Sequence, residues 1–281
     1  MIRHTRRRFI KFSTAAIAGL ISTPAISLIA NNELNHPVIK TIKVPIRNLP
    51  DAFHGYRIVA MTDFHIYPYA RPELMRKCVE LANELKPDLG VYLGDYVWQE
   101  EDAIFELAPI LAGLNARHGI FAVIGNHDIW ADVEMVKQGL RESRIPVMLN
   151  HGVQLSDGSS SINLVGLDDG WSGHADLGAA YQGLPDNTPT VMLLHEPDLA
   201  DEYAYDPRVS LMLAGHTHGG QVRFNGKPII APYLGKKYNM GLFQVGDLWL
   251  YTSPGVGVIS IPIRYNCPPE VSEIILVNGS S

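Results

Sequence analysis

Cysteine is scarce in this chain, with Cys78 and Cys267 as the only two among 281 residues. Two cysteines form at most one bridge, which excludes a small disulfide-stapled fold, and each also fits the role of a small buried apolar residue. An excess of positive charge is missing as well, since 23 basic residues stand against 29 acidic ones, for a formal net charge of −6. The sequence therefore offers no general attraction for nucleic acid, and an anionic phosphate substrate would need local cations such as bound metal ions.

Long apolar runs are confined to the start of the chain. After residue 30 no segment is long and apolar enough to cross a membrane, and there is no internal repeat or low-complexity segment. No domain linker is visible after residue 50. We therefore expect residues 31–281 to form one domain.

The first thirty residues have the pattern of an export signal. Residues 5–11 read T-R-R-R-F-I-K, which resembles the twin-arginine motif, and a weakly apolar stretch from Phe12 to Ala30 follows. A basic segment before an apolar one is the secretory pattern, and the stretch is close to the roughly 20 residues that span a bilayer. We expect residues 1–30 to be a cleaved signal peptide or an uncleaved anchor. The alternative is a basic N-terminal tail with no targeting function. The prediction places the protein in the periplasm or cell envelope, exported by the twin-arginine machinery and open to membrane association.

Five clusters of metal-ligand residue types each come directly after an apolar run. An apolar run that ends in Gly, Asp or His is typical of a buried strand with a polar side chain at its tip. Five such tips meeting at one edge would surround a common point with oxygen and nitrogen ligands. The clusters are Asp63-Phe64-His65, Gly94-Asp95, Gly125-Asn126-His127-Asp128, His195 and Gly215-His216-Thr217-His218.

Strands and helices alternate in the first half of the chain. Expected strands at 56–61, 89–93 and 120–124 are separated by helices that begin at Pro72 and near Asp102, and a third helix covers about 132–142. This alternation predicts an α/β fold with parallel crossovers and ligands at the carboxyl ends of the strands. The second half has short strands at 147–149, 153–155, 162–165, 191–194, 209–214, 221–224, 248–252 and 271–277, which predict a second sheet packed on the first with helices outside.

The spacing of the clusters suits a site for two cations. Asp63 and His65 are two residues apart, which in an extended segment points both to one face, and His216 and His218 repeat this spacing. Asp95 is the natural bridging ligand because a carboxylate has two oxygens, while Asn126 offers an amide oxygen. Mixed carboxylate and imidazole ligands suit Mn, Fe or Zn, and two such ions suit phosphoryl hydrolysis.

The ordered set D-x-H, G-D, G-N-H-D, a lone His and G-H-x-H resembles the calcineurin-like metallophosphoesterases over about residues 56–220. The resemblance implies a four-layer αββα sandwich of two mixed sheets, with one cation bound by Asp63, His65, Asp95 and His218 and a second by Asp95, Asn126, His195 and His216. Two divalent ions per chain are implied, with Mn favoured over Fe or Zn. In the family a metal-bound hydroxide attacks phosphorus, the residue matching His127 assists the departing oxygen, and Asp128 would orient its imidazole.

Motifs beyond the ligand set resemble one bacterial branch of exported or membrane-associated phosphodiesterases, which includes proteins similar to the pyrophosphatase that cleaves UDP-2,3-diacylglucosamine. The substrate implied is a phosphodiester or pyrophosphate, either an envelope lipid precursor of this kind, as in lipid A biosynthesis, or a cell-wall polymer. A phosphomonoesterase and a catalytically silent scaffold are the alternatives. One departure is Pro254, where the branch leads us to expect Arg. The motifs are residues 215–221, 231–233, 241–243 and 262–270.

Several other polar and aromatic residues have two interpretations. Asp168 and Asp169 follow a strand and either support the site or form a turn, and Arg264 serves packing, carbonyl binding or catalysis. Lys236 and Lys237 bind a phosphate diester or are simply solvated. Trp130, Trp171 and Tyr67 either line an apolar mouth for a lipid or belong to ordinary packing. The substrate-binding residues stay unassigned, and six histidines are expected to lie outside the site: His4, His36, His54, His118, His151 and His174.

Overall fold

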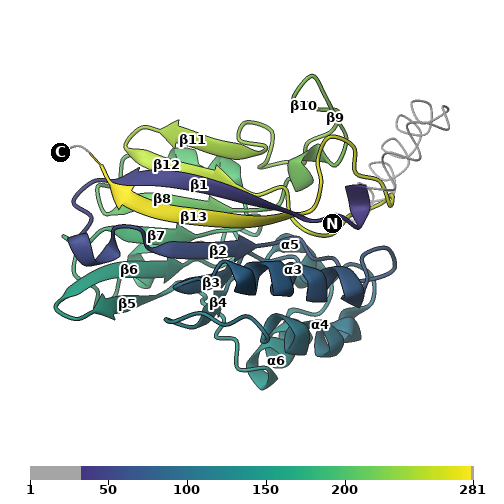
Figure 1. Ribbon diagram of the computed structural model, residues 1–281, viewed down its shortest axis with the longest axis horizontal. Coiled ribbons are helices and arrows are strands. Elements are labelled where there is room, and N and C mark those ends of the chain that lie inside the picture. The colour runs from purple at the N-terminus through teal and green to yellow at the C-terminus, as the bar shows by residue number, and fades with distance from the viewer. Residues whose placement is uncertain (1–32, 280–281) are drawn as a thin grey trace.

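Two mixed β-sheets stack face to face in a computed structural model that describes residues 33–279, and helices cover both outer faces (Figure 1). This four-layer α/β arrangement confirms the fold predicted from the sequence. The predicted signal or anchor, residues 1–30, lies outside the described residues. Within residues 33–279, no helix combines the length and apolarity needed to cross a bilayer.

The first sheet has five strands in the order β1-β13-β2-β3-β4. β2, β3 and β4 run parallel, as their alternation with helices predicts, whereas β13 pairs antiparallel with β2 and parallel with β1. The purple β1 and the yellow β13 lie side by side in Figure 1, so the two ends of the domain share one sheet. The strands are β1 (Val38–Ile46), β2 (Arg57–Met61), β3 (Leu89–Tyr92), β4 (Ile120–Ala122) and β13 (Glu270–Asn278).

The second sheet has six strands in the order β11-β12-β8-β7-β6-β5. Its four central strands are parallel and its two edge strands antiparallel. The strands are β5 (His151–Asp157), β6 (Ser160–Gly166), β7 (Thr190–Leu193), β8 (Val209–Ala214), β11 (Gly241–Val245) and β12 (Leu248–Thr252).

Local signals explain the outer helices. Pro72 occupies the first helical turn of α3, where a missing N–H costs nothing, and Asp132 caps α6 by accepting from the backbone N–H groups of Glu134 and Met135. The remaining elements are α3 (Pro72–Glu84), α4 (Ile104–Leu111), α5 (Asn126–Trp130), α6 (Val133–Glu142), α7 (Leu177–Ala180), α8 (Ala200–Tyr203), the 3₁₀ turns η1 (Asp51–Phe53), η2 (Glu101–Ala103), η3 (Pro197–Leu199) and η4 (His218–Gly220), and the hairpin of β9 (Arg223–Phe224) and β10 (Lys227–Pro228).

Three apolar clusters hold the layers together. One lies between the two sheets and contains Ile58, Val91 and Leu213, one packs the first sheet against α3, α4 and α6, and one packs the second sheet against α7 and α8. Burial on both faces explains why the central strands read as continuous apolar runs. This double packing fixes the ends of β2, β3, β4, β7 and β8, where the ligand-type residues begin.

Some details differ from the expectations. Residues 147–149 form no strand, and Val147 makes an isolated bridge to Ala122. The helix expected from Asp102 to 114 is a 3₁₀ turn followed by α4, and Pro109 lies inside α4. The last strand joins the first sheet, which the pattern of the second half of the sequence did not indicate. Cys78 and Cys267 are both buried and both free, so the two do not pair.

Candidate metal centre

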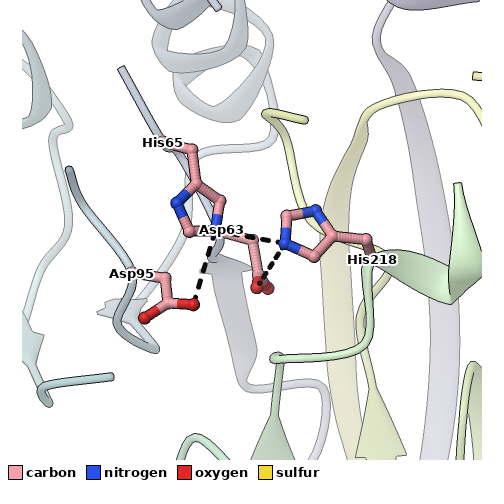
Figure 2. Close-up of side chains that lie close together, drawn as sticks. All are labelled: Asp63, His65, Asp95 and His218. Carbon is pink, nitrogen blue, oxygen red and sulfur yellow. Dashed lines mark hydrogen bonds and ion pairs between the residues drawn. The ribbon is translucent and has the colours of Figure 1, made fainter. Parts of the chain in front are cut away.

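Two groups of buried ligand atoms meet at the carboxyl ends of the strands. Asp63, His65, Asp95 and His218 form the first group, and Asp95, His195 and His216 form the second. Within each group the ligand atoms lie within 4.8 Å of one another. Figure 2 shows the first group, in which the side chains of Asp95 and His218 approach those of Asp63 and His65 from opposite sides. Asp95 belongs to both groups, as expected of a bridging ligand.

Left-handed backbone brings these side chains together. Asp63, His65, Asp95, His216 and His218 all have positive φ, between 41° and 72°. Non-glycine residues rarely adopt this region, and such strain gathers at functional sites. The expectation of extended D-x-H and H-x-H segments is therefore wrong, although both members of each pair do reach the cluster.

Glycines before the ligands allow close packing of the loops. A Cβ on Gly125 would collide with Oδ1 of Asp95, and a Cβ on Gly215 would lie 2.6 Å from Oδ2 of Asp63. Any side chain at these positions would push a carboxylate out of place. The Gly that precedes a ligand residue in the third and fifth clusters thus has a steric cause.

Each carboxylate is anchored by one oxygen and turns the other toward histidines of the cluster. Oδ2 of Asp63 accepts from the N–H of His216 at 3.0 Å, and Oδ1 of Asp95 accepts from the N–H of His127 at 2.8 Å. Asp63 Oδ1 and Asp95 Oδ2 are buried and accept no hydrogen bond within the described part of the chain. An unpartnered buried carboxylate oxygen is costly unless a cation binds it.

Three of the histidines are oriented by backbone carbonyls. The Nδ1 atoms of His65 and His195 contact the oxygens of Val97 and Leu93 at 3.2 and 2.6 Å, and Nε2 of His216 contacts the oxygen of Tyr233 at 2.7 Å. A ring nitrogen that donates to a carbonyl leaves the other nitrogen with its lone pair, which is the form that binds metal. The ring nitrogens that keep a lone pair for metal are Nε2 of His65 and His195 and Nδ1 of His216.

Asn126 and His218 are the two remaining residues of the predicted ligand set. The amide oxygen of Asn126 is buried and has no hydrogen-bond partner among residues 33–279, and Nε2 of His218 lies 3.1 Å from Nε2 of His65 and 3.3 Å from Oδ1 of Asp63. The orphaned oxygens and the fixed tautomers fit two divalent cations bound by oxygen and nitrogen. The structure thus holds two buried His/Asp clusters suited to a dinuclear metal site.

The electrostatics of Asp95 and His195 are linked. Burial alone would raise the pKa of Asp95, but its interactions with the surrounding histidines, His195 above all, outweigh burial and hold this pKa well below its usual value. Burial would likewise lower the pKa of His195, and the Asp95 carboxylate raises it well above the ordinary value instead. A cation that binds both residues must therefore displace a proton from His195.

His127 and Asp128 directly follow Asn126 in the chain and have different surroundings. Burial, opposed by the charge of Asp95, lowers the pKa of His127 to about 3, so the surroundings favour a neutral imidazole. Asp128 is fully buried, and its carboxylate accepts from the backbone N–H groups of Asp95, Tyr96 and Gly125 at 2.8–3.0 Å. These bonds hold the loop that carries Asp95, so Asp128 positions a ligand loop, and its role in orienting the imidazole stays a prediction.

Aromatic rings flank the metal centre. Trp98 and Trp130 both contact His127 with ring centroids 4.7 Å apart, and Trp171 contacts His216 at 5.8 Å. Tyr67 does not join them in the described structure, since its hydroxyl donates to Glu106. Sequence reasoning did not single out Trp98, although its position three residues after Asp95 could have signalled it.

The other ambiguous residues also have defined partners. Arg264 is fully buried and donates to the carbonyl oxygens of Gly257, Cys267 and Pro254, which selects carbonyl binding among its interpretations. Lys237 donates to Asp201, so its ammonium is paired on the surface. Asp169 is fully buried next to Glu196, and its Oδ2 accepts from the N–H of Ser172.

The comparisons with known proteins agree with this geometry. Residues 56–220 match the calcineurin-like phosphoesterase family. The chain belongs to this family. It is a metallophosphoesterase, a hydrolase that acts on phosphoric esters.

Individual relatives extend the match beyond the motif region. The chain is 33% identical to the metallophosphoesterase YkuE of Bacillus subtilis, over 98% of this chain and 99% of that protein. It is also 33% identical to the phosphodiesterase YaeI of Escherichia coli, over 79% of this chain and 82% of that protein. A 5′-nucleotidase precursor from Thermus thermophilus shares the fold, with a TM-score of 0.50 and 14% identity over 72% of this metallophosphoesterase and 49% of that chain.

Proposed function

We propose that this metallophosphoesterase is a phosphodiesterase that hydrolyses a phosphodiester or pyrophosphate bond with two divalent cations, Mn favoured over Fe or Zn. The observation that carries the proposal is the pair of ligand groups that share Asp95 and direct unpartnered buried atoms toward one volume. The 33% identity to a protein named as a phosphodiesterase supports the diester over the monoester.

The residues have separate tasks in this proposal. Asp63, His65, Asp95 and His218 would hold one cation, and Asp95, Asn126, His195 and His216 the other. The cations would supply Lewis-acid stabilisation of the phosphoryl oxygens and a nucleophile from water near neutral pH. His127, whose backbone N–H donates to Asp95, would donate a hydrogen bond from its imidazole to the departing oxygen.

We further propose export by the twin-arginine route, with retention in the periplasm or at the inner membrane. The support is the sequence of residues 5–30. An exported enzyme would act on a cell-wall polymer or an envelope lipid, whereas a nucleotide-linked lipid such as UDP-2,3-diacylglucosamine would be met on the cytoplasmic side. Fractionation of the native protein, compared with the double variant Arg6→Lys, Arg7→Lys, decides between a location outside the cytoplasm and one inside it.

Turnover of simple substrates tests the reaction itself. The purified protein is stripped of metal and assayed with bis(p-nitrophenyl) phosphate and p-nitrophenyl phosphate, before and after Mn is restored. We expect metal-dependent hydrolysis with preference for the diester, and its loss in the double variant Asn126→Ala, His127→Ala. Full activity of this double variant would overturn the proposal. Preference for the monoester would favour the phosphomonoesterase alternative. Absence of bound metal in the purified protein would favour the catalytically silent scaffold.

A further inference from the structure

We propose that four rings beside the metal centre, here named the aromatic wall (Trp98, Trp130, Trp171 and Tyr233), bind an apolar group of the substrate, an aryl or alkyl moiety esterified to the phosphate. The inference rests on the proposed phosphodiesterase function and adds the class of substrate to it. It makes the aromatic wall the specificity-determining surface of the site.

The rings form a continuous arc from one functional residue to another. Trp98 and Trp130 each lie 4.7 Å from His127, Trp130 lies 5.2 Å from Trp171, and Trp171 lies 5.8 Å from His216, all between ring centroids. The arc thus begins at the residue proposed to assist the departing oxygen and ends at a ligand of the second cation. A group esterified to a phosphate that lies between His127 and His216 is within reach of these rings.

The wall leaves apolar surface open at the rim of the site. Trp130 is 40% exposed and Tyr233 is 61% exposed, whereas Trp98 and Trp171 are partly buried. Burying such surface is favourable by roughly 25 cal/mol per Å². The ring of Trp171 stands at 85° to Trp130 and at 90° to Tyr233, which makes a ridged surface that can contact a chain as well as a planar ring.

Buried polar contacts fix the wall to the metal centre. The loop that carries Trp171 is held by two fully buried carboxylates, Asp169, which accepts from the N–H of Ser172 at 2.7 Å, and Glu196, which accepts from the N–H of Gly170 at 3.1 Å. Glu196 directly follows the ligand His195 in the chain. Glu196 therefore holds the loop of Trp171 next to the ligand residue His195.

The other rings are tied to the centre in the same way. The carbonyl oxygen of Tyr233 contacts Nε2 of His216 at 2.7 Å, and Trp130 ends α5, the helix that begins at Asn126. The indole N–H of Trp98 is buried and has no hydrogen-bond partner among residues 33–279, so a donor is available at the foot of the wall. A wall held this way is preorganised, which reduces the entropy cost of binding an apolar group.

Three diesters of glycerol phosphate, with ethyl, phenyl and dodecyl groups, test the inference on the Mn-loaded full chain, with products measured by chromatography. We expect the wild type to prefer the phenyl and dodecyl diesters over the ethyl one in kcat/KM. Because phenoxide is intrinsically the better leaving group, the size of the loss in Trp171→Ala, and not the preference itself, identifies an aryl or an alkyl group. Trp171→Ala should lower kcat/KM about 10- to 100-fold for the apolar diesters and less than about threefold for the ethyl diester. Trp171→Phe should restore part of the loss, and Tyr205→Ala, at a residue 82% exposed outside the ring arc, serves as the control.

Binding measurements keep the inference separate from the proposed reaction. Dodecyl, phenyl and methyl phosphonates, which cannot be hydrolysed as esters, are titrated into wild type and Trp171→Ala while tryptophan fluorescence is followed. Tighter binding of the apolar phosphonates that is lost in Trp171→Ala supports the wall even if no diester is turned over, in which case the proposed function alone fails. Equal loss for all three ligands, or no loss for any, overturns the inference.

Discussion

Oδ2 of Asp95 lies 3.1 Å from Nε2 of His195, a contact that becomes an ion pair when His195 is protonated. The same oxygen lies 3.4 Å from Nε2 of His65, which belongs to the other ligand group. This carboxylate oxygen lies between two ring nitrogens, and a backbone carbonyl contacts the far nitrogen of each ring, so a cation of either group can share the oxygen with a histidine. Asp95 is therefore the residue on which both halves of the proposed centre depend.

Asp95→Asn should remove the shared ligand. We expect bound metal to fall from two ions per chain to one or none, and kcat/KM to fall by more than about 100-fold, because loss of a ligand exceeds the effect of losing a residue that only orients one. Metal analysis by mass spectrometry and the diester assay measure both effects. His151→Ala, an exposed histidine on β5, is the matched control. Two ions retained at full occupancy in Asp95→Asn would contradict the bridging role.

His127→Ala and Asp128→Asn should separate chemistry from structure. His127→Ala leaves the ligands in place, so we expect metal content close to that of the wild type with activity reduced about 100-fold or more. In Asp128→Asn an amide group replaces an acceptor that receives several backbone N–H groups, so we expect a loss of about 1–3 kcal/mol in the free energy of unfolding together with weaker metal binding. Urea unfolding and metal titration distinguish the two variants. An unchanged stability of Asp128→Asn would restore the role of orienting the imidazole.

The sequence predicted which residues meet, because each ligand cluster follows an apolar run and parallel strands end at one edge. It could not predict the left-handed backbone of Asp63 and His216, because their conformation is imposed by contacts between loops distant in sequence, such as the bond from the N–H of His216 to Asp63. The bonds of Asp128 to Asp95 and Tyr96 could not be predicted for the same reason, since these partners lie 33 and 32 residues earlier in the chain. The insertion of β13 between β1 and β2 likewise follows from pairing across the whole domain.

Arg264→Lys should not be a conservative change. The guanidinium donates to three carbonyl groups from a fully buried position, and a single ammonium cannot reproduce this fork. One of these carbonyls belongs to Pro254. In the same segment, the backbone N–H of Gly257 donates to the backbone carbonyl oxygen of the ligand residue Asp63 at 2.7 Å. We expect a loss of about 2–4 kcal/mol in the free energy of unfolding and a lower affinity for metal, measured by urea unfolding and metal titration. Arg76→Lys on the surface of α3 controls for the substitution, and equal stability of the two variants would contradict the structural role.

Glu270 should give the protein a pH-dependent stability that does not involve the metal centre. Burial raises the pKa of this carboxyl, although hydrogen bonds from Ser272 and Tyr251 oppose the shift. Because the folded state holds the proton above the pH at which the unfolded chain releases it, this contribution is complete below the ordinary carboxyl pKa and is lost as the pH rises through the raised value. We expect the free energy of unfolding, measured in urea from pH 4 to 8, to fall more steeply for the wild type than for Glu270→Gln. Glu134→Gln, at an exposed carboxyl, should keep the wild-type slope, and parallel curves for all three proteins would show that Glu270 titrates normally.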